Sequence, residues 1–221
     1  MERRDICVFG SLNVDLTVKM ARFHAPGETV TGESFNVYTG GKGGNQAVAA
    51  ARLGAGVKLV ACLGEDANGE LYASALAHEG IDASGVQRHA DVSSGVAVIE
   101  VDARGENRIV VVPGANGRLD AAAADAAKSI IAGCGFLLLQ LETPLDGVIE
   151  AARIAHGAGA VVILDPAPAR PLPDELLALC DYVTPNETKA KNSDIGNSTT
   201  LWVSSISILV SIAGLLVNIL K

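Results

Sequence analysis

The sequence predicts an α/β protein whose main sheet is mostly parallel and is covered by helices on both faces. From Asp5 to about Val183, short apolar and β-branched runs alternate with Ala-rich helical segments. This is the order expected for a parallel sheet with helical crossovers. One pair of β-branched runs, 96–101 and 108–112, interrupts the alternation. We therefore expect a small second sheet that contains this pair.

In the first half of the chain, the pattern predicts strands at 6–9, 14–18 and 57–62 and helices at 45–53 and 71–78. Gly10 ends the first strand, and Gly54 and Gly80 follow the two helices. Glycine readily adopts the left-handed conformation that ends many helices. Residues 102–106, between the two β-branched runs, are mostly polar and include Gly105, so these runs are expected to form a hairpin.

The second half continues the alternation of helices and strands. Asp120 is a suitable N-cap for an Ala-rich helix that reaches Ile131. Apolar strands are expected at 136–139 and 161–164. Pro144 suits the first position of the next helix, and Pro173 opens a further helix that ends near Cys180.

The composition is that of a folded chain. Of 221 residues, 49% are apolar and 19% are charged, which excludes a disordered class. The net charge of -8, without a basic patch, argues against a nucleic-acid partner. The first residues lack the apolar segment of a signal peptide, so a cytoplasmic protein is expected.

The cysteines are expected to be reduced core thiols. Cys7, Cys62, Cys134 and Cys180 are far apart and lie beside apolar residues. They form no Cys-x-x-Cys motif or Cys/His cluster, so the sequence predicts no metal site. Two disulfides are the alternative, which a cytosolic α/β pattern disfavours.

The character of the chain changes after Glu187. Residues 188–200 are polar and resemble a linker, and residues 201–220 contain no charged side chain. A run of about twenty such residues can cross a bilayer as a helix. A buried helix of a soluble protein is the alternative. The run is too uniformly apolar for an amphipathic surface helix, and we expect an apolar, membrane-type helix.

A glycine-rich segment at 40–47, Gly-Gly-Lys-Gly-Gly-Asn-Gln-Ala, is the most informative part of the sequence. A Walker loop would need Ser or Thr where Gly43 stands. A dinucleotide-binding loop would directly follow the first strand, which instead leads into residues 10–13. A plain turn before a helix would explain the glycines but not Lys42 or Asn45. The free N–H groups of such a helix start could face ligand oxygens.

Amide, ammonium and carboxylate groups are what a polyhydroxy ligand requires, because each sugar hydroxyl both donates and accepts hydrogen bonds. Lys42 and Asn45 lie in the glycine segment, and Asn13 and Asp15 follow the first strand. Glu142 follows a buried strand, at the edge where ligands bind in open α/β sheets. Taken singly, turn formation explains Asn13, solvation explains Asp15, and a helix N-terminus explains Glu142.

Together these segments resemble the ribokinase branch of the PfkB carbohydrate kinase family. The likeness runs from Asp5 to Glu187. The matching segments are Gly-Ser-Leu-Asn-Val-Asp at 10–15, Pro-Gly-Glu-Thr-Val-Thr-Gly at 26–32, residues 40–47, Gly54, Gly64, Pro-Gly-Ala-Asn at 113–116, Gln-Leu-Glu-Thr-Pro at 140–144, Asp-Pro-Ala-Pro-Ala-Arg at 165–170 and Thr-Pro-Asn-Glu at 184–187.

The resemblance implies a ribokinase-like three-layer sandwich with a mainly parallel sheet and a small β lid. Residues 1–187 then form the sugar-binding portion, with the lid at about 12–40 and 95–113. A linker follows at 188–200 and the apolar helix at 201–220. The resemblance also implies a homodimer formed through the lid.

The resemblance further implies ATP-dependent phosphorylation of ribose or a related sugar at its terminal hydroxyl, with magnesium on the phosphates. The sugar-binding positions are Asn13, Val14, Asp15, Gly41, Lys42, Gly43, Gly44, Asn45 and Glu142. Asn186 matches an asparagine that contacts ATP phosphates.

Two departures bear on catalysis. Lys189 stands where the family's Asn-x-x-Glu motif has a glutamate that helps to place magnesium. The family's Gly-Ala-Gly-Asp motif, which supplies the catalytic base and the anion hole, does not occur. We expect a truncated chain that has no catalytic residue, binds ATP poorly and transfers no phosphoryl group. A membrane-tethered sugar-binding remnant and the product of a disrupted gene are the alternatives.

Overall fold

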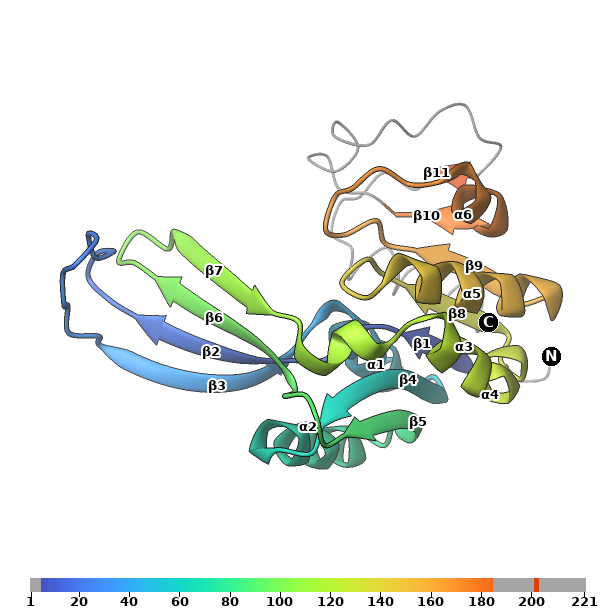
Figure 1. Ribbon diagram of the computed structural model, residues 1–221, viewed down its shortest axis with the longest axis horizontal. Coiled ribbons are helices and arrows are strands. Elements are labelled where there is room, and N and C mark those ends of the chain that lie inside the picture. Colours follow the sequence, from blue (N-terminus) through green and yellow to red (C-terminus); the bar gives the residue numbers. More distant parts are fainter. Residues whose placement is uncertain (1–4, 185–200, 203–221) are drawn as a thin grey trace.

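The computed structural model describes residues 5–184 and 201–202, and it contains two sheets (Figure 1). The larger sheet has seven strands in the order β11-β10-β9-β8-β1-β4-β5, and every adjacent pair is parallel. The strands are β1 (Ile6–Phe9), β4 (Val57–Gly64), β5 (Asp82–His89), β8 (Phe136–Leu139), β9 (Val161–Leu164), β10 (Tyr182–Val183) and β11 (Leu201–Trp202).

Helices cover both faces of this sheet, as the sequence predicts. Ile6 and Val8 of β1 pack in one core cluster with α1 (Lys42–Arg52) and α2 (Ala67–His78). Cys7 and Phe9 point to the opposite face, because side chains alternate along a strand. That face is covered by α3 (Ala121–Ala126), α4 (Lys128–Ala132), α5 (Leu145–Gly157) and α6 (Asp174–Leu179). The result is a three-layer sandwich.

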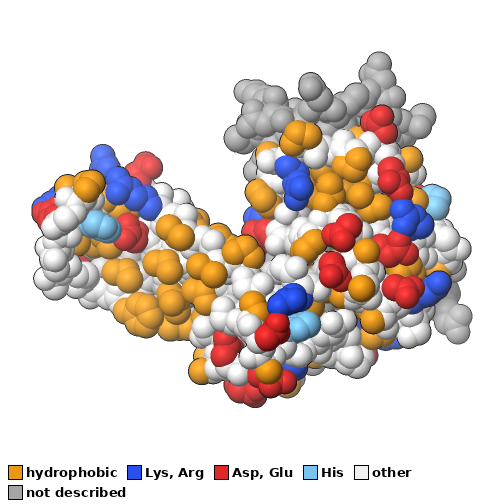
Figure 2. Space-filling model, in the orientation of Figure 1, with side chains coloured by type: hydrophobic (Ala, Val, Ile, Leu, Met, Phe, Trp, Pro, Cys, Tyr) orange, Lys and Arg blue, Asp and Glu red, His pale blue; other side chains and the backbone are white. Residues whose placement is uncertain are grey.

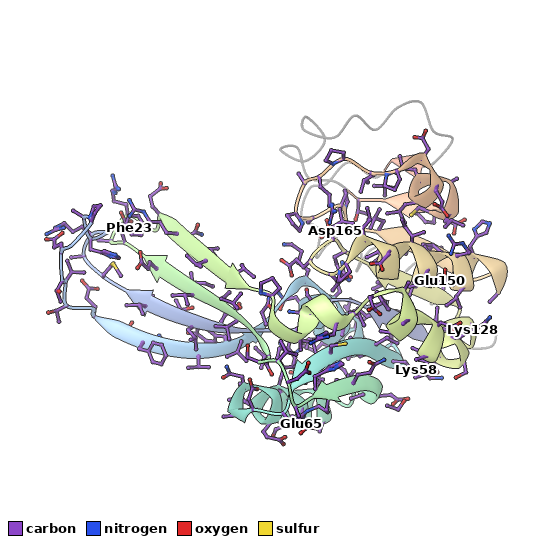
Figure 3. The ribbon with its side chains drawn as sticks, viewed as in Figure 1. Phe23, Lys58, Glu65, Lys128, Glu150 and Asp165 are labelled. Atoms are coloured by element: carbon purple, nitrogen blue, oxygen red, sulfur yellow. The ribbon has the colours of Figure 1, made fainter. Side chains whose placement is uncertain are left out.

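The smaller sheet, called the lid below, has the strand order β3-β2-β6-β7. It consists of β2 (Asn13–Lys19), β3 (Ser34–Gly40), β6 (Gly95–Val101) and β7 (Asn107–Val112). The predicted hairpin is confirmed, since β6 and β7 pair antiparallel. The lid projects from the body (Figure 1). Phe23 lies at its far end, where the Arg108 guanidinium stacks 4.2 Å from the ring centroid (Figure 3).

Two helix boundaries differ from the sequence prediction. Asp120 caps α3 by accepting a hydrogen bond from the Ala123 N–H at 3.0 Å, but the helix does not run unbroken to Ile131. At Ala127 the N–H is shared between the carbonyls of the third and fourth preceding residues, which makes a tighter turn that separates α3 from α4. Pro144 has extended ψ of 135° and directly precedes α5.

The C-terminal prediction is wrong where it can be compared. Leu201 and Trp202, expected to begin an apolar helix, form β11 and pair in parallel with Tyr182 and Val183. The edge of β10 offers unpaired backbone groups, and a short strand satisfies them. None of the helices among residues 5–184 is long and apolar enough to cross a membrane. The predicted linker, 188–200, and residues 203–220 lie outside the described residues.

Candidate functional site

Glu142 joins three segments that are distant in sequence. It follows β8, whose neighbour in the sheet is β1, and Ser11 lies just beyond the end of β1. Oε2 of Glu142 accepts a hydrogen bond from Ser11 Oγ at 2.6 Å and one from the backbone N–H of Lys42 at 3.0 Å. Oε1 lies 3.6 Å from Lys42 Nζ. The carboxylate therefore anchors the start of α1 to the carboxyl edge of the sheet.

Asp15 supplies a second carboxylate at the same place. Burial raises its pKa, and the nearby charge of Glu142 raises it further. Gly40, on the neighbouring strand, leaves the room that this side chain occupies: a Cβ there would lie 2.1 Å from Asp15 Oδ2. Two carboxylates and the ammonium of Lys42 thus share one partly buried region.

Asn13 lies on the same face of β2 as Asp15, because side chains two residues apart on a strand point the same way. Asn13 is only 4% exposed, and its Oδ1 accepts a hydrogen bond from Asn116 Nδ2 at 2.8 Å. The structure therefore brings Asn13, Asp15, Lys42 and Glu142 to one region, at the root of the lid, where its strands β2 and β3 join the body.

The glycine segment contributes less free backbone than the sequence suggested. Gly43 N donates to Ser11 Oγ at 3.4 Å, and Gly44 N donates to Ser11 O at 3.0 Å. With the Lys42 N–H already bound to Glu142, the first three N–H groups of α1 are occupied within the protein. The expectation that these groups are free for a ligand is wrong, because Ser11 and Glu142 reach them first.

Close packing explains why glycines stand in this segment. A Cβ at Gly43 would lie 2.6 Å from the backbone carbon of Gly10, and one at Gly44 would lie 1.8 Å from the Tyr72 hydroxyl oxygen. Gly41 has φ of +82°, in the left-handed region that side chains rarely adopt. The glycines let α1 begin directly against the connection between β1 and β2.

Three predicted positions remain, Val14, Asn45 and Asn186. Val14 is fully buried and packs in the core cluster beneath α1, so its side chain does not face the site. Asn45 is exposed on α1, one turn beyond Lys42 and on the same side of the helix. Asn186 lies outside the described residues.

Three residues of this region were not predicted as site residues. Ser11 bridges Glu142 and the N-terminus of α1. Asn116 binds Asn13, and Tyr72 donates from its hydroxyl to Gly40 O at 2.5 Å. Ser11 and Asn116 stand inside segments that match the family, which was the available signal. Tyr72 lies on α2 without a motif around it, and its contact with Gly40 is visible only in three dimensions.

The space-filling view shows a hollow between the lid and the body as an open notch (Figure 2). Below this notch, β2 and β3 join the body (Figure 1). Within the described parts of the chain, no three His, Cys, Asp or Glu residues are grouped to hold a metal ion.

Comparison with known proteins identifies the family. The sequence model described as pfkB family carbohydrate kinase matches residues 3–193. A ribokinase of Haemophilus influenzae is 46% identical over 189 residues, which are 86% of this chain and 62% of that protein. A ribokinase of Schizosaccharomyces pombe is 42% identical over 192 residues, 84% of this chain and 60% of that protein. The chain thus spans somewhat less than two thirds of each.

The fold is also that of a solved relative. The structure of Arabidopsis thaliana ribokinase complexed with ribose and ATP superposes with a TM-score of 0.81 at 32% sequence identity. The match covers 99% of this chain and 69% of that one.

Proposed function

Because this chain belongs to the pfkB family of carbohydrate kinases, we propose that it is the sugar-binding portion of a ribokinase-type enzyme. The reaction of such an enzyme is ATP-dependent phosphorylation of D-ribose, or of a related pentose, at the terminal hydroxyl. The residues that hold the sugar are those gathered around Glu142.

The observation that carries this proposal is the convergence of Asn13, Asp15, Lys42 and Glu142 at one edge of the sheet. Carboxylates accept hydrogen bonds from sugar hydroxyls, whereas an ammonium and an amide N–H donate to them. A ring of hydroxyls can satisfy both kinds of group together. A ligand that lacks a hydroxyl leaves one of these partly buried groups unpaired, which is the physical basis of selectivity.

Catalysis is a separate matter. In the family's reaction ATP supplies the phosphoryl group, while the aspartate of Gly-Ala-Gly-Asp takes the proton of the attacking hydroxyl. The 221-residue sequence does not contain that motif, and Asn186, the position assigned to ATP phosphates, lies outside the described residues. We therefore propose that this chain by itself binds and orients the sugar but does not phosphorylate it.

The lid supports a second part of the proposal, association with another copy of this chain. All residues of β7 are exposed, and apolar side chains gather on the lid (Figure 2). The exposed large apolar side chains of its strands are Phe35, Val37, Tyr38, Val98, Ile109, Val110, Val111 and Val112. Such a patch is typical of a surface that another protein covers. We propose a homodimer formed through the lid.

Titration calorimetry with D-ribose tests the sugar site. We expect the purified chain to bind D-ribose saturably, with a Kd above about 10 μM. The Asp15→Asn variant should show no binding. Absence of saturable binding in a folded chain would contradict the proposed sugar site. A parallel assay for ADP formation with ribose and ATP should match the protein-free control; ribose-dependent turnover that Asp15→Asn abolishes would contradict the non-catalytic part.

A further inference from the structure

Asn116 makes three hydrogen bonds to the segment that carries Asn13. It lies in the short 3-10 helix η1 (Gly114–Arg118) and is only 1% exposed. Its Oδ1 accepts from the backbone N–H of Leu12 at 2.8 Å. Its Nδ2 donates to the Leu12 carbonyl at 3.0 Å and to Asn13 Oδ1 at 2.8 Å. Asn116 therefore satisfies both backbone groups of Leu12 and one end of the neighbouring amide.

The backbone of Leu12 determines which way both amides face. The two ends of an amide have nearly the same shape, so hydrogen-bond partners must assign them. The Leu12 N–H can only donate and its carbonyl can only accept, so Asn116 must turn Oδ1 to the first and Nδ2 to the second. The same Nδ2 faces Asn13. Asn13 must therefore turn its oxygen toward Asn116.

The surroundings hold this arrangement in place. A Cβ at Gly95 would lie 2.3 Å from Asn116 Nδ2 and 2.4 Å from Asn13 Oδ1. The two amides thus pack directly against the backbone of β6, which pairs with β2 at this position. Among the residues that the structure describes, the Asn13 amide is hydrogen-bonded through Oδ1, and its other end, Nδ2, makes no hydrogen bond.

We propose that Asn116 is a positioning residue that sets the hydrogen-bond polarity of the sugar site. Through Asn116, Asn13 offers a donor to the ligand, beside the acceptors of Asp15 and Glu142. A sugar hydroxyl at Asn13 must then accept a hydrogen bond, whereas hydroxyls at the two carboxylates must donate. The role toward a sugar rests on the proposed function; the orientation of the Asn13 amide does not.

Side-chain amide signals in ¹H–¹⁵N NMR spectra of the full chain test the orientation first. The signal pair of Asn13 is assigned by its disappearance in the Asn13→Asp variant. Without sugar, we expect the NH₂ of Asn13 to exchange with water at least tenfold faster than the NH₂ of Asn116, whose two hydrogens are both bonded. Equal protection of the two groups in the unliganded chain would overturn the proposal.

The Asn116→Asp variant then reverses the polarity. The aspartate cannot donate, so the Asn13 amide should turn its NH₂ to the new carboxylate and present its oxygen to the site. We expect its NH₂ to become protected without sugar and D-ribose affinity to fall at least tenfold. Asn107→Asp, an exposed position on β7, should change neither. Affinity within twofold of the unmodified chain would overturn the proposal.

A second variant keeps the test valid if Asn116→Asp does not fold. Asn13→Asp preserves the bond from Asn116 but replaces the free donor with an acceptor, so the ribose affinity of the folded variant should again fall at least tenfold. Unchanged affinity would contradict the proposal. If ribose perturbs no signal although the unliganded exchange pattern is as expected, the proposed sugar function fails and the amide orientation stands.

Discussion

Lys42 Nζ lies 3.6 Å from Glu142 Oε1, and the backbone N–H of Lys42 donates to the other oxygen of the same carboxylate at 3.0 Å. The two residues are 100 positions apart in the chain. The Glu142 carboxylate therefore binds both the ammonium group and the backbone N–H of the residue that starts α1. Glu142 is only partly buried and lies near Asp15. Replacing its carboxylate with an amide should therefore affect ligand binding more than stability.

Glu142→Gln should lower D-ribose affinity by about 10- to 100-fold, the equivalent of losing one hydrogen bond to a charged group. The unfolding free energy should fall by less than about 1 kcal/mol, because the ion pair with Lys42 is only partly buried. Calorimetric titration and urea unfolding measure the two effects.

Glu65→Gln is the matched control for that change. Glu65 is exposed beyond the end of β4, and in Figure 3 it lies on the side of the molecule opposite the hollow. The same loss of one charge there should leave ribose affinity unchanged. A loss of affinity as large as in Glu142→Gln would mean that net charge, rather than the local contacts, explains the effect.

Asp15→Asn should remove sugar binding yet stabilise the fold at neutral pH. The folded state raises the pKa of Asp15, mainly through burial and then through the charge of Glu142. A raised pKa means that the contribution of this group to stability is complete below its ordinary value of about 3.9 and is lost as the pH rises through the folded-state value. Asparagine does not ionise and avoids that loss.

The measurement for Asp15→Asn is the urea unfolding free energy at pH 3 and pH 7, compared with the unmodified chain. The advantage of the variant should be larger at pH 7 than at pH 3. An advantage that shrinks as the pH rises would contradict the stated cause of the pKa shift.

Gly43→Ala should destabilise the protein by about 1 to 3 kcal/mol, the usual effect of overpacking. The added Cβ would lie 2.6 Å from the backbone of Gly10, which cannot rotate away. Gly157→Ala, also within a helix but with nothing within 4 Å of its Cβ, should instead stabilise by about 0.5 to 1 kcal/mol. Denaturant unfolding measures the unfolding free energy of both variants. An unchanged free energy in Gly43→Ala would contradict the prediction.

Val110→Lys should prevent the proposed dimer without unfolding the chain. Val110 is 65% exposed on β7, so a charge there meets water in the monomer but would be buried against a second lid. Sedimentation velocity should show dimers of the unmodified chain and monomers of the variant, while Asn107→Lys at the end of the same strand remains dimeric. A monomeric unmodified chain at high concentration would refute the lid interface.

The four cysteines should react with a thiol reagent much more slowly in the native state than in the unfolded chain. All four are free and buried, which confirms the sequence prediction. Burial raises the pKa of Cys62 to about 12 and that of Cys180 to about 12, so little thiolate forms at pH 8. Four thiols should react in guanidinium. Hydrogen bonding with Cys7 lowers the pKa of Cys134, which should therefore react first in the native state; early reaction of Cys62 would contradict this order.

Among the strands that the sequence did not predict, β5 and β3 show the physical reason. β5 begins with Asp-Ala-Ser-Gly and lies at an edge of the main sheet, where pairing with β4 overrides poor strand propensity. β3 is mostly exposed and carries no buried apolar face, so its pattern resembles a loop until β2 pairs with it. In both cases a long-range backbone partner, rather than local preference, makes the strand.

The candidate site divides in a similar way. Asn13, Asp15, Lys42 and Glu142 could be predicted because their chemistry suits a ligand. Lys42 lies in the glycine segment, and the other three follow predicted strands. Ser11 was not predicted, although it stands in a segment that matches the family, because serine after a strand is common and its function depends on a carboxylate that arrives from β8. The expectation that the N–H groups of the glycine segment are free was wrong because Ser11 and Glu142, from other segments, bind them.

The sequence by itself determined the family, the alternation of strands and helices, the separate hairpin and the polar groups offered to a ligand, because each of these is encoded in local patterns or short motifs. Only the tertiary structure decided which polar atoms remain available. Hydrogen bonds across 104 residues from Asn116 to Leu12 and across 131 residues from Ser11 to Glu142 use up some donors and acceptors and leave others free. Such pairings depend on how strands are ordered in the sheet, which no local stretch of sequence contains.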